Sequence, residues 1–284
     1  MSFVFHIIAM IGLWLPLMLG FNLVFGKGKI FHFGPTGVAL VAAYATFVTL
    51  AGAWSWTTAI LTGFLFTSCI SVVFAWLALR LDPDGLGVMT IAVHLAFLSV
   101  VLNWDSLTRG ALGIAFISCW TILDGLPAFA AVSLLGGFFW FLVFWWADRS
   151  SLGRALSALG EHPWYAASLG VNRSVVTLLA FLLLGAAQMW TSVLYPQYMH
   201  LLHPNDYQFS NFIFVLMVVV AGGPGSVQGV AISTILLVFL KEGLRFLPLP
   251  VFLLGPLRLF LFGLILFAAI WWRRDKIFPP ERQV

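Results

Sequence analysis

DRSSLGRALSALGEHPWYAASLGVN, residues Asp148–Asn172, is the longest stretch of soluble character in a chain that otherwise consists of apolar blocks. One apolar run, Pro127–Ala147, precedes it, and another, Val175–Leu194, follows it. Apolar runs on both sides of such a stretch are typical of two membrane spans joined by a connection on one membrane face. The stretch therefore predicts a membrane protein with a structured element at its surface.

The composition of this stretch predicts two short surface helices. Ser150 or Ser151 can cap the first helix, which is rich in Ala and Leu. Pro163 disfavours the helical conformation at the residue before it and suits the first turn of a second helix. That helix can end at Gly170, because glycine tolerates the left-handed conformation of a helix C-cap. We expect a helix–break–helix along one membrane face, with Glu161 at the bend, which suits binding to a partner outside the membrane.

The overall composition indicates a polytopic α-helical membrane protein. Hydrophobic residues make up 62% of the 284 residues and charged residues only 8%, against about a quarter in soluble domains. The mean hydropathy is +1.04, and several apolar runs reach the roughly 20 residues that cross a bilayer. The aqueous ends of the spans and anionic lipid headgroups account for the formal net charge of +4. We therefore expect membrane lipid, and no nucleic acid, as a partner.

The sequence predicts an all-α transmembrane helical bundle of about eight or nine spans in a single domain, residues 1–284. The two candidate spans that begin at Phe209 and Val227 are short for a full bilayer crossing. The candidates are Phe3–Phe25, Thr36–Gly52, Trp56–Leu79, Gly87–Asn103, Pro127–Ala147, Val175–Leu194, Phe209–Ala221, Val227–Leu240 and Pro256–Trp272.

The basic residues predict how the chain is oriented. Alternation of the candidate spans puts ten of the 14 Lys and Arg residues on the side of Asp148–Asn172 and four on the other. By the positive-inside rule, the richer side is cytoplasmic. The N-terminus and a loop at residues 104–126 are then external, and a basic tail at residues 273–284 is cytoplasmic.

Charged residues fall in the predicted connections or at span edges, and His94 is the ionisable side chain well inside a span. Ion-coupled transporters usually bury ionisable groups as relays, so this chain offers little means of coupling to a proton gradient. Sodium bound by backbone carbonyls at broken helices stays open. For His94 itself, packing, a polar path and a relay are all open.

Glycines interrupt the apolar pattern at GKGKIFHFGPTG, residues 26–37, and at GGPGSVQG, residues 222–229. Irregular backbone at membrane depth is tolerated only where it is buried in protein or lines a wet cavity. Each cluster is therefore a plain turn or part of a translocation path. In the external loop, Gly110 and Gly113 allow sharp turns, and the loop either lies in the membrane interface or dips in as a re-entrant piece with a gating role.

Motifs that carry enzyme chemistry are absent. The chain lacks the phosphate-binding loop of nucleotide hydrolases and has no GxSxG, HExxH or paired CxxC motif. His200, His203 and Asp206 form a faint candidate for a metal site or for a lipid-modifying enzyme, against a solvated loop. Cys69 and Cys119 lie in apolar surroundings and suit packing better than a disulfide. We expect no catalytic residue, resident metal or cofactor.

Several segments together resemble the permeases of branched-chain amino acid ABC importers. GRALSALGEHPWYAASLGVN, residues 153–172, is similar to the cytoplasmic coupling loop of that family, which reads roughly GRALRAIREDEIAAEALGIN. The similarity covers nearly the whole chain from about Gly20 onward. The further pieces, which keep the family's order, are GFNLVFG (20–26), FGPTGVALVAAY (33–44), NWDSLTRGALGI (103–114), FIFVLMVVVAGGPGSVQGV (212–230) and RLFLFGLILFAAIWWRRD (258–275).

The resemblance implies the permease subunit of an ATP-binding cassette importer in the bacterial inner membrane. The implied partners are a second, homologous permease chain, two ATPase subunits that hydrolyse the ATP, and an external solute-binding protein. The implied solute is a branched-chain amino acid or a related small polar molecule. Residues 148–172 would be the coupling loop, and the residues expected to dock on an ATPase are Glu161, Pro163, Ala166, Ala167 and Gly170.

Polar side chains and glycines in the spans are candidates for the translocation path, against a role in interhelical hydrogen bonding. The coupling loop departs from the family pattern at Gly160, Pro163 and Tyr165. The segment before the second span departs from it at His32 and Pro35, and these two departures put the solute itself in question. The path candidates are Asn22, Thr36, Tyr44, Thr90, His94, Asn103, Gln188, Thr191, Gly222, Gly223 and Gly225.

The alternative function is an ion-coupled carrier or channel that works without ATPase subunits. In that case the purified chain should move solute by itself, whereas the permease should not. An intramembrane enzyme is a further alternative, and it would depend on His200, His203 and Asp206.

Overall fold

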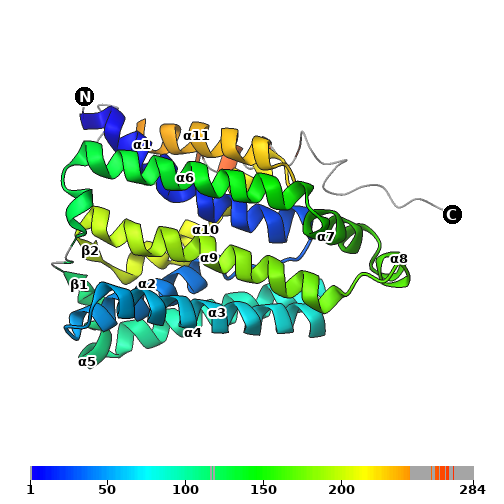
Figure 1. Ribbon diagram of the computed structural model, residues 1–284, viewed down its shortest axis with the longest axis horizontal. Coiled ribbons are helices and arrows are strands. Elements are labelled where there is room, and N and C mark those ends of the chain that lie inside the picture. The colour runs from blue at the N-terminus through cyan, green and yellow to red at the C-terminus, as the bar shows by residue number, and fades with distance from the viewer. Residues whose placement is uncertain are drawn as a thin grey trace.

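The computed structural model describes residues 2–115, 117 and 119–243, together with isolated positions between 257 and 271. In this part of the chain, long helices lie side by side along one axis, and the N-terminus lies at the end opposite α8 (Figure 1). The predicted span Pro256–Trp272 and the basic tail at residues 273–284 lie outside the continuously described residues.

The bundle confirms the expected all-α fold. Each of the first eight predicted spans coincides with a helix, and five helices are long and apolar enough to cross a membrane. The long helices are α1 (Ser2–Phe21), α3 (Trp56–Arg80), α4 (Pro83–Asn103), α6 (Leu126–Arg149) and α9 (Arg173–Met199). The shorter apolar helices are α2 (Pro35–Ala51), α10 (Phe209–Gly222) and α11 (Val227–Gly243).

Helix α1 is the most buried of the five long helices and packs against α6, α9 and α11. Its backbone meets that of α6 directly, because a Cβ on Gly137 would lie 2.9 Å from the Cα of Gly12. The Ser133 hydroxyl reinforces this crossing by donating to the Ala9 carbonyl oxygen, at 2.7 Å. Small residues allow such close approach of two membrane helices, where packing drives association.

The end of α1 continues as a π-helix, η1 (Asn22–Lys27), which meets the turn between α10 and α11. The Asn22 side-chain oxygen accepts a hydrogen bond from the Gly225 backbone N–H, at 2.8 Å. Gly223 and Gly225 in that turn have φ values of 94° and 86°, which a side chain would strain. The 14 residues of α10 rise only about 21 Å, so the glycine turn closes a short hairpin beside α1.

Residues 28–34, between η1 and α2, contain no helix and run into the interior of the bundle. His32 is fully buried, with its ring 4.7 Å from the Phe74 ring and 5.1 Å from the Phe181 ring. Phe181 lies eight residues into α9, which corresponds to a depth of about 12 Å. The Phe33 N–H donates to the Thr90 hydroxyl, at 3.0 Å. This irregular backbone is thus buried in protein, as membrane depth requires.

The end of the bundle that carries the N-terminus is closed by short elements. These are α5 (Asp105–Thr108), η2 (Gly110–Leu112), η3 (Thr121–Leu123), η4 (Pro204–Tyr207) and the antiparallel strands β1 (Ile114–Ala115) and β2 (Leu201–Leu202). The strand pair ties the loop at residues 104–126 to the chain after α9. Gly110 and Gly113 have positive φ, which confirms the expected sharp turns.

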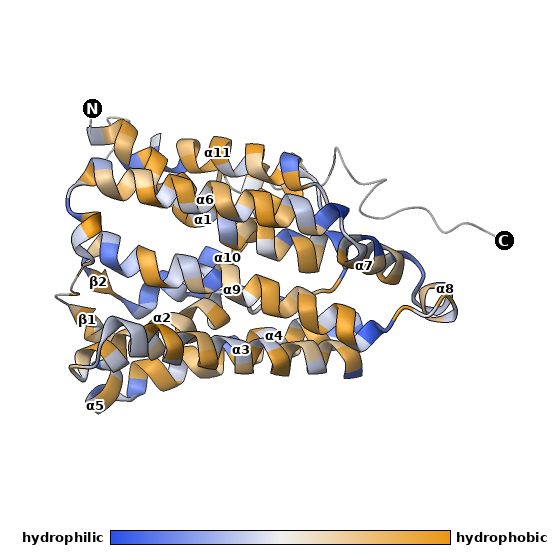
Figure 2. Ribbon diagram, viewed as in Figure 1, coloured by the Kyte–Doolittle hydropathy of each residue, from blue (hydrophilic) through white to orange (hydrophobic). Residues whose placement is uncertain are grey.

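Hydropathy follows the long axis of the bundle. Hydrophobic residues cover the outer faces of the long helices, and hydrophilic residues gather toward both ends and around α7 (Figure 2). Large apolar side chains such as Leu65, Trp76, Phe139 and Phe239 are exposed on those faces. The chain is therefore a multi-pass membrane protein whose lipid-facing surface is the side of the bundle.

Candidate functional site

The stretch Asp148–Asn172 forms the predicted pair of helices, α7 (Ser151–Glu161) and α8 (Pro163–Ser168), with the break at His162. Ser150 occupies the position that precedes α7, but its hydroxyl donates to the Ala147 carbonyl oxygen, at 2.7 Å. The expected cap of α7 by the Ser150 side chain is therefore wrong, because this hydroxyl is bonded to the last turn of α6.

Helix α7 is held firmly against the end of α1. Leu156 and Leu159 are buried, and such burial stabilises by roughly 1.5–3 kcal/mol per side chain. A Cβ on Gly160 would lie 3.0 Å from the carbonyl oxygens of Lys27 and Gly28, so the backbones are in contact there. The Lys27 ammonium also pairs with the Asp148 carboxylate and donates to the Asp148 carbonyl oxygen. A displacement of α7 must therefore move the end of α1.

Helix α8 ends in a defined cap. Gly170 has φ of 82°, and its N–H donates to the Ala167 carbonyl oxygen while the Val171 N–H donates to that of Ala166, both at 3.0 Å. These two bonds form a Schellman motif, which confirms the expected stop at Gly170. Ala166 is buried, and the cap at Gly170 and Val171 ends α8 just before the chain enters α9 at Arg173.

The outer face of α8 is apolar and exposed. Trp164 is 90% exposed, Leu169 is 83% exposed, and Tyr165 is exposed as well. The predicted docking residues Glu161, Pro163, Ala167 and Gly170 lie exposed around them. Helix α8 lies at the extreme end of the bundle, far from the lipid-facing sides (Figure 1). An exposed apolar patch in that position is typical of a protein–protein contact.

Four of the predicted path residues use their polar groups within the fold. Asn22 accepts from Gly225, as described above, and Thr90 accepts from Phe33. The Thr191 hydroxyl donates to the Leu13 carbonyl oxygen, at 2.8 Å. Asn103 is exposed at the end of α4 and donates to the Ser99 carbonyl oxygen, at 2.7 Å. These contacts supply interhelical and local hydrogen bonds.

The other four polar path candidates gather around α2. The Gln188 side-chain N–H donates to the Pro35 carbonyl oxygen at 3.0 Å, and His94 Nδ1 lies 3.5 Å from the Thr36 hydroxyl. Gln188 Oε1, His94 Nε2 and the Tyr44 hydroxyl are buried and have no hydrogen-bond partner in the described part of the chain. The structure therefore places α2 beside several polar atoms with unused bonding capacity.

The predicted path glycines have structural roles. A Cβ on Gly222 would lie 2.6 Å from the Val230 Cα, so this glycine lets α10 and α11 approach closely. Gly223 and Gly225 form the turn of that hairpin. Whether any of the three lines a path stays a prediction.

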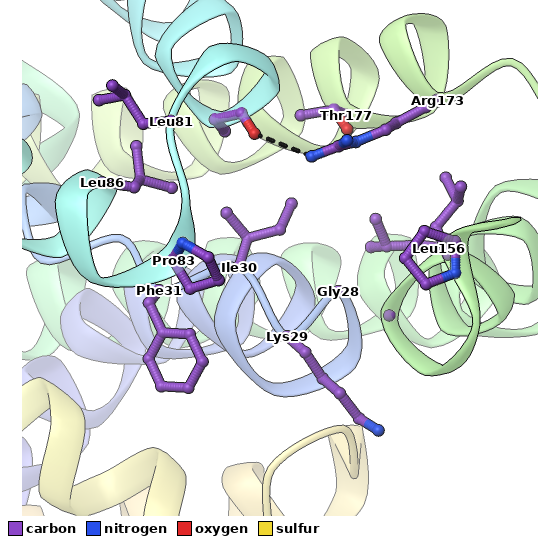
Figure 3. Close-up of a pocket in the computed structure, with 14 residues that line it drawn as sticks. Gly28, Lys29, Ile30, Phe31, Leu81, Pro83, Leu86, Leu156, Arg173 and Thr177 are labelled. Atoms are coloured by element: carbon purple, nitrogen blue, oxygen red, sulfur yellow. Dashed lines mark hydrogen bonds between the residues drawn. The ribbon is translucent and has the colours of Figure 1, made fainter.

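A cavity of about 220 Å³ lies beneath α7, where the stretch at residues 28–31 enters the bundle. Its other walls are the turn between α3 and α4, and the first residues of α9, including Arg173 and Thr177 (Figure 3). The cavity therefore separates the α7–α8 pair from the ends of three long helices.

Comparison with known proteins identifies the family. A family described as "Branched-chain amino acid transport system / permease component" matches residues 3–270. The chain belongs to this family of permeases. It is 28% identical to the high-affinity branched-chain amino acid transport system permease protein LivM of Salmonella typhimurium, over 95% of this chain and 68% of the relative. The LivM protein of Escherichia coli is 27% identical over the same shares. No solved structure matches the permease.

The permease buries two ionisable residues that the sequence did not reveal. His32 lies in the irregular stretch before α2, and neither ring nitrogen has a hydrogen-bond partner among the described residues. Glu242 is buried at the end of α11 and lies 3.2 Å from His6 Nε2. The expectation that His94 is the ionisable group inside the spans is therefore incomplete. Glu242 was missed because α11 continues beyond its apolar run. His32 was missed because residues 28–34, which include polar residues typical of a surface turn, fold into the bundle.

His200, His203 and Asp206 do not form a cluster in the permease. His203 Nδ1 accepts from the Asn205 N–H at 3.1 Å, while His200 Nδ1 lies 3.3 Å from the Cys119 thiol. Within the described ranges, no three His, Cys, Asp or Glu side chains could hold a metal ion.

The two cysteines of the permease differ in surroundings. Burial, followed by the charge of Asp124, raises the pKa of the Cys119 thiol, which therefore stays neutral at pH 7. Cys69 is exposed on α3, so the expected packing role is wrong for Cys69. The reason is that α3 turns this side of the helix outward, toward lipid.

Proposed function

We propose that this permease is the transmembrane subunit of an ATP-binding cassette importer for branched-chain amino acids or a related small polar solute in the bacterial inner membrane. Its proposed partners are a second, homologous permease chain, two ATPase subunits and an external solute-binding protein. The observation that carries the proposal is the exposed apolar face of α8. This helix follows α7, which packs against the bundle through Leu156 and Leu159. The names of the LivM relatives support the class of solute.

The contacts of α7 and α8 give a route for mechanical work. Closure of two ATPase subunits would push on α8, which leads through its cap into α9, and on α7, which touches Lys27 and Gly28 at the end of η1, the continuation of α1. Helix α1 packs on α6, α9 and α11, so its movement reaches most of the bundle. A partner that binds one arrangement more tightly than another shifts the population toward it. The ATPase would thereby switch the permease between inward-facing and outward-facing states.

The polar atoms around α2 suit a neutral or zwitterionic solute. These atoms can form hydrogen bonds to a solute, and none of them belongs to an Asp, Glu, Lys or Arg side chain. They come from Thr36, Tyr44, His94 and Gln188. A path of this kind holds no strong binding site, which leaves selectivity to the solute-binding protein. Exchange of the binding protein should therefore change the transported solute, and unchanged specificity would contradict this part of the proposal.

The first prediction concerns energy coupling. The permease reconstituted with its partner chain, ATPase subunits and binding protein should take up labelled leucine only when ATP is supplied. Without the ATPase subunits, uptake should fall to the level of empty vesicles, with or without a proton or sodium gradient. Gradient-driven uptake by the permease chains alone would instead establish the ion-coupled carrier.

The second prediction concerns orientation, since we propose that α8 is cytoplasmic and the N-terminus external. Cysteine is introduced at Leu112 or at Leu169, both more than 80% exposed and at opposite ends of the bundle, after Cys69 and Cys119 are replaced by Ser. A membrane-impermeant maleimide should label the Leu112→Cys variant in intact cells. The Leu169→Cys variant should be labelled only after permeabilisation, and the reverse pattern would overturn the proposed orientation.

A further inference from the structure

The cavity beneath α7 combines apolar walls with the guanidinium of Arg173, a residue that is otherwise exposed. Side chains from four separate parts of the chain form the walls, among them Ile30, Leu81, Leu86, Leu156 and Leu159. Figure 3 shows Ile30, Leu81, Leu86 and Leu156 around the space, with Arg173 extending along its edge from the start of α9. At about 220 Å³ the cavity is smaller than the roughly 300 Å³ at which drug-sized pockets begin. A volume of this size suits a small molecule.

The guanidinium of Arg173 has donors to spare. Its Nη2 donates to the Ala78 carbonyl oxygen at 3.2 Å (Figure 3), and it forms no ion pair with an Asp or Glu of the described residues. A guanidinium carries five N–H donors in a fork that matches an oxyanion. The Thr177 hydroxyl lines the same wall one turn further along α9. Arg173 also opens α9, where the helix dipole favours a negative charge.

Among the described residues that line the cavity there is no Asp or Glu. None of these side chains could therefore neutralise Arg173 or pair with the ammonium group of a ligand. Lys29 also lines the cavity, and its ammonium points away from Arg173 (Figure 3). The ammonium group of an amino acid would therefore meet no carboxylate here, so the lining favours a molecule with a single negative charge and an aliphatic body.

We propose that this cavity binds a small aliphatic carboxylate, with the carboxylate on the Arg173 guanidinium and the aliphatic body against Leu86, Leu156 and Leu159. A bound molecule would fill the space between α7 and the turn that joins α3 and α4. It would therefore oppose displacement of α7 toward the bundle and reduce the response of the spans to α8. This consequence for transport rests on the proposed function, whereas binding itself does not.

The test measures binding to the full-length chain in phosphatidylcholine nanodiscs, without ATPase subunits. The probe is 4-methylpentanoate, and the comparison probes are 4-methylpentan-1-ol, acetate and leucine. Calorimetry should show binding of 4-methylpentanoate and about tenfold or weaker binding of the other three, since each lacks the charge, lacks the aliphatic body or adds an ammonium. Equal binding of the alcohol or of acetate would overturn the proposal.

Matched variants locate the site. Arg173→Gln should weaken 4-methylpentanoate binding about tenfold or more, the effect expected for loss of a charge-assisted pair, and Arg173→Lys should restore part of it. Arg154→Gln, which removes an exposed cation on α7 that does not line the cavity, should leave binding unchanged. Unchanged binding by Arg173→Gln would overturn the assignment.

An anionic lipid could also place an oxyanion and an aliphatic chain in this cavity. Nanodiscs containing phosphatidylglycerol should leave 4-methylpentanoate binding unchanged if the ligand is a soluble carboxylate. Displacement of the probe by phosphatidylglycerol, lost in Arg173→Gln, would overturn that identification in favour of an anionic lipid. Because these measurements need no ATPase, their failure would leave the ATP-dependent uptake experiment unaffected.

Discussion

Replacing Trp164 with alanine should weaken binding of the ATPase subunit to the permease roughly 30-fold and reduce ATP-driven uptake accordingly. Trp164 is 90% exposed on α8 and contributes almost nothing to the packing of the chain itself. Exposed tryptophans at the centre of an interface are typical hot spots, worth about 2 kcal/mol or more when truncated, and about 2 kcal/mol corresponds to roughly 30-fold in affinity. The measurements are the dissociation constant of the purified ATPase and uptake by the reconstituted importer.

The control for Trp164→Ala is Trp54→Ala, at the opposite end of the bundle. Trp54 is also well exposed and follows the last turn of α2. Its loss should leave the affinity of the ATPase unchanged. The thermal stability of both variants should match the wild type, because surface substitutions usually change the free energy of unfolding by less than about 0.5 kcal/mol. Normal ATPase binding by Trp164→Ala would show that α8 is not the docking surface.

The architecture and α8 could be predicted from the sequence because both depend on local signals. A run of about 20 apolar residues identifies a span wherever the span packs, and Pro163 and Gly170 define the start and the stop of α8 through their own backbone preferences. Side-chain capping is harder to predict where two helices adjoin, because the hydroxyl between them has a partner on either side. The Ser150 hydroxyl bonds to Ala147 at the end of α6 and not to α7. The end of a neighbouring helix can therefore override a favourable local choice.

The interior polar contacts could not be predicted, because they join residues far apart in the chain. His6 and Glu242 meet only because α1 and α11 run side by side. Asn22 is a path candidate from the sequence, and the hydrogen bond from Gly225 to its side-chain oxygen could not be predicted. Residues 28–34 contain two glycines and Lys29, which suggest a surface turn, although His32 is fully buried. Hydropathy indicates that a polar group is present, and the packing of distant helices decides what it bonds to.

The predicted coupling residues differ in exposure. Ala166 is buried, whereas Glu161, Pro163 and Ala167 are exposed beside Trp164. The proposed docking surface of α8 therefore includes three large exposed side chains, Trp164, Tyr165 and Leu169, which were not among the predicted docking residues. The signal was available in the sequence, since large apolar residues in an otherwise polar connection are unusual.

Replacing Gly12 with alanine should destabilise the folded permease by about 3 kcal/mol, at the upper end of the cost of overpacking a core. A Cβ at this position would lie 2.7 Å from the Leu134 backbone nitrogen and closer still to the Ser133 carbonyl group. Backbone atoms cannot rotate out of the way as a flexible side chain can, so α1 and α6 would have to separate. Because α1 also packs on α9 and α11, the separation would disturb the centre of the bundle.

The matched control for Gly12→Ala is Gly243→Ala, at the end of α11, where no described atom outside the local helix backbone lies within 4 Å of the added Cβ. Both glycines are helical, so both substitutions gain the helix propensity of alanine, about 1 kcal/mol, and only Gly12→Ala adds a clash. In detergent, the thermal midpoint of Gly12→Ala should fall by several degrees or the folded species should disappear, whereas that of Gly243→Ala should equal or exceed the wild type. A stable Gly12→Ala variant would mean that α1 and α6 do not meet backbone to backbone, and the route from α8 through α1 into the bundle would then lose its main contact.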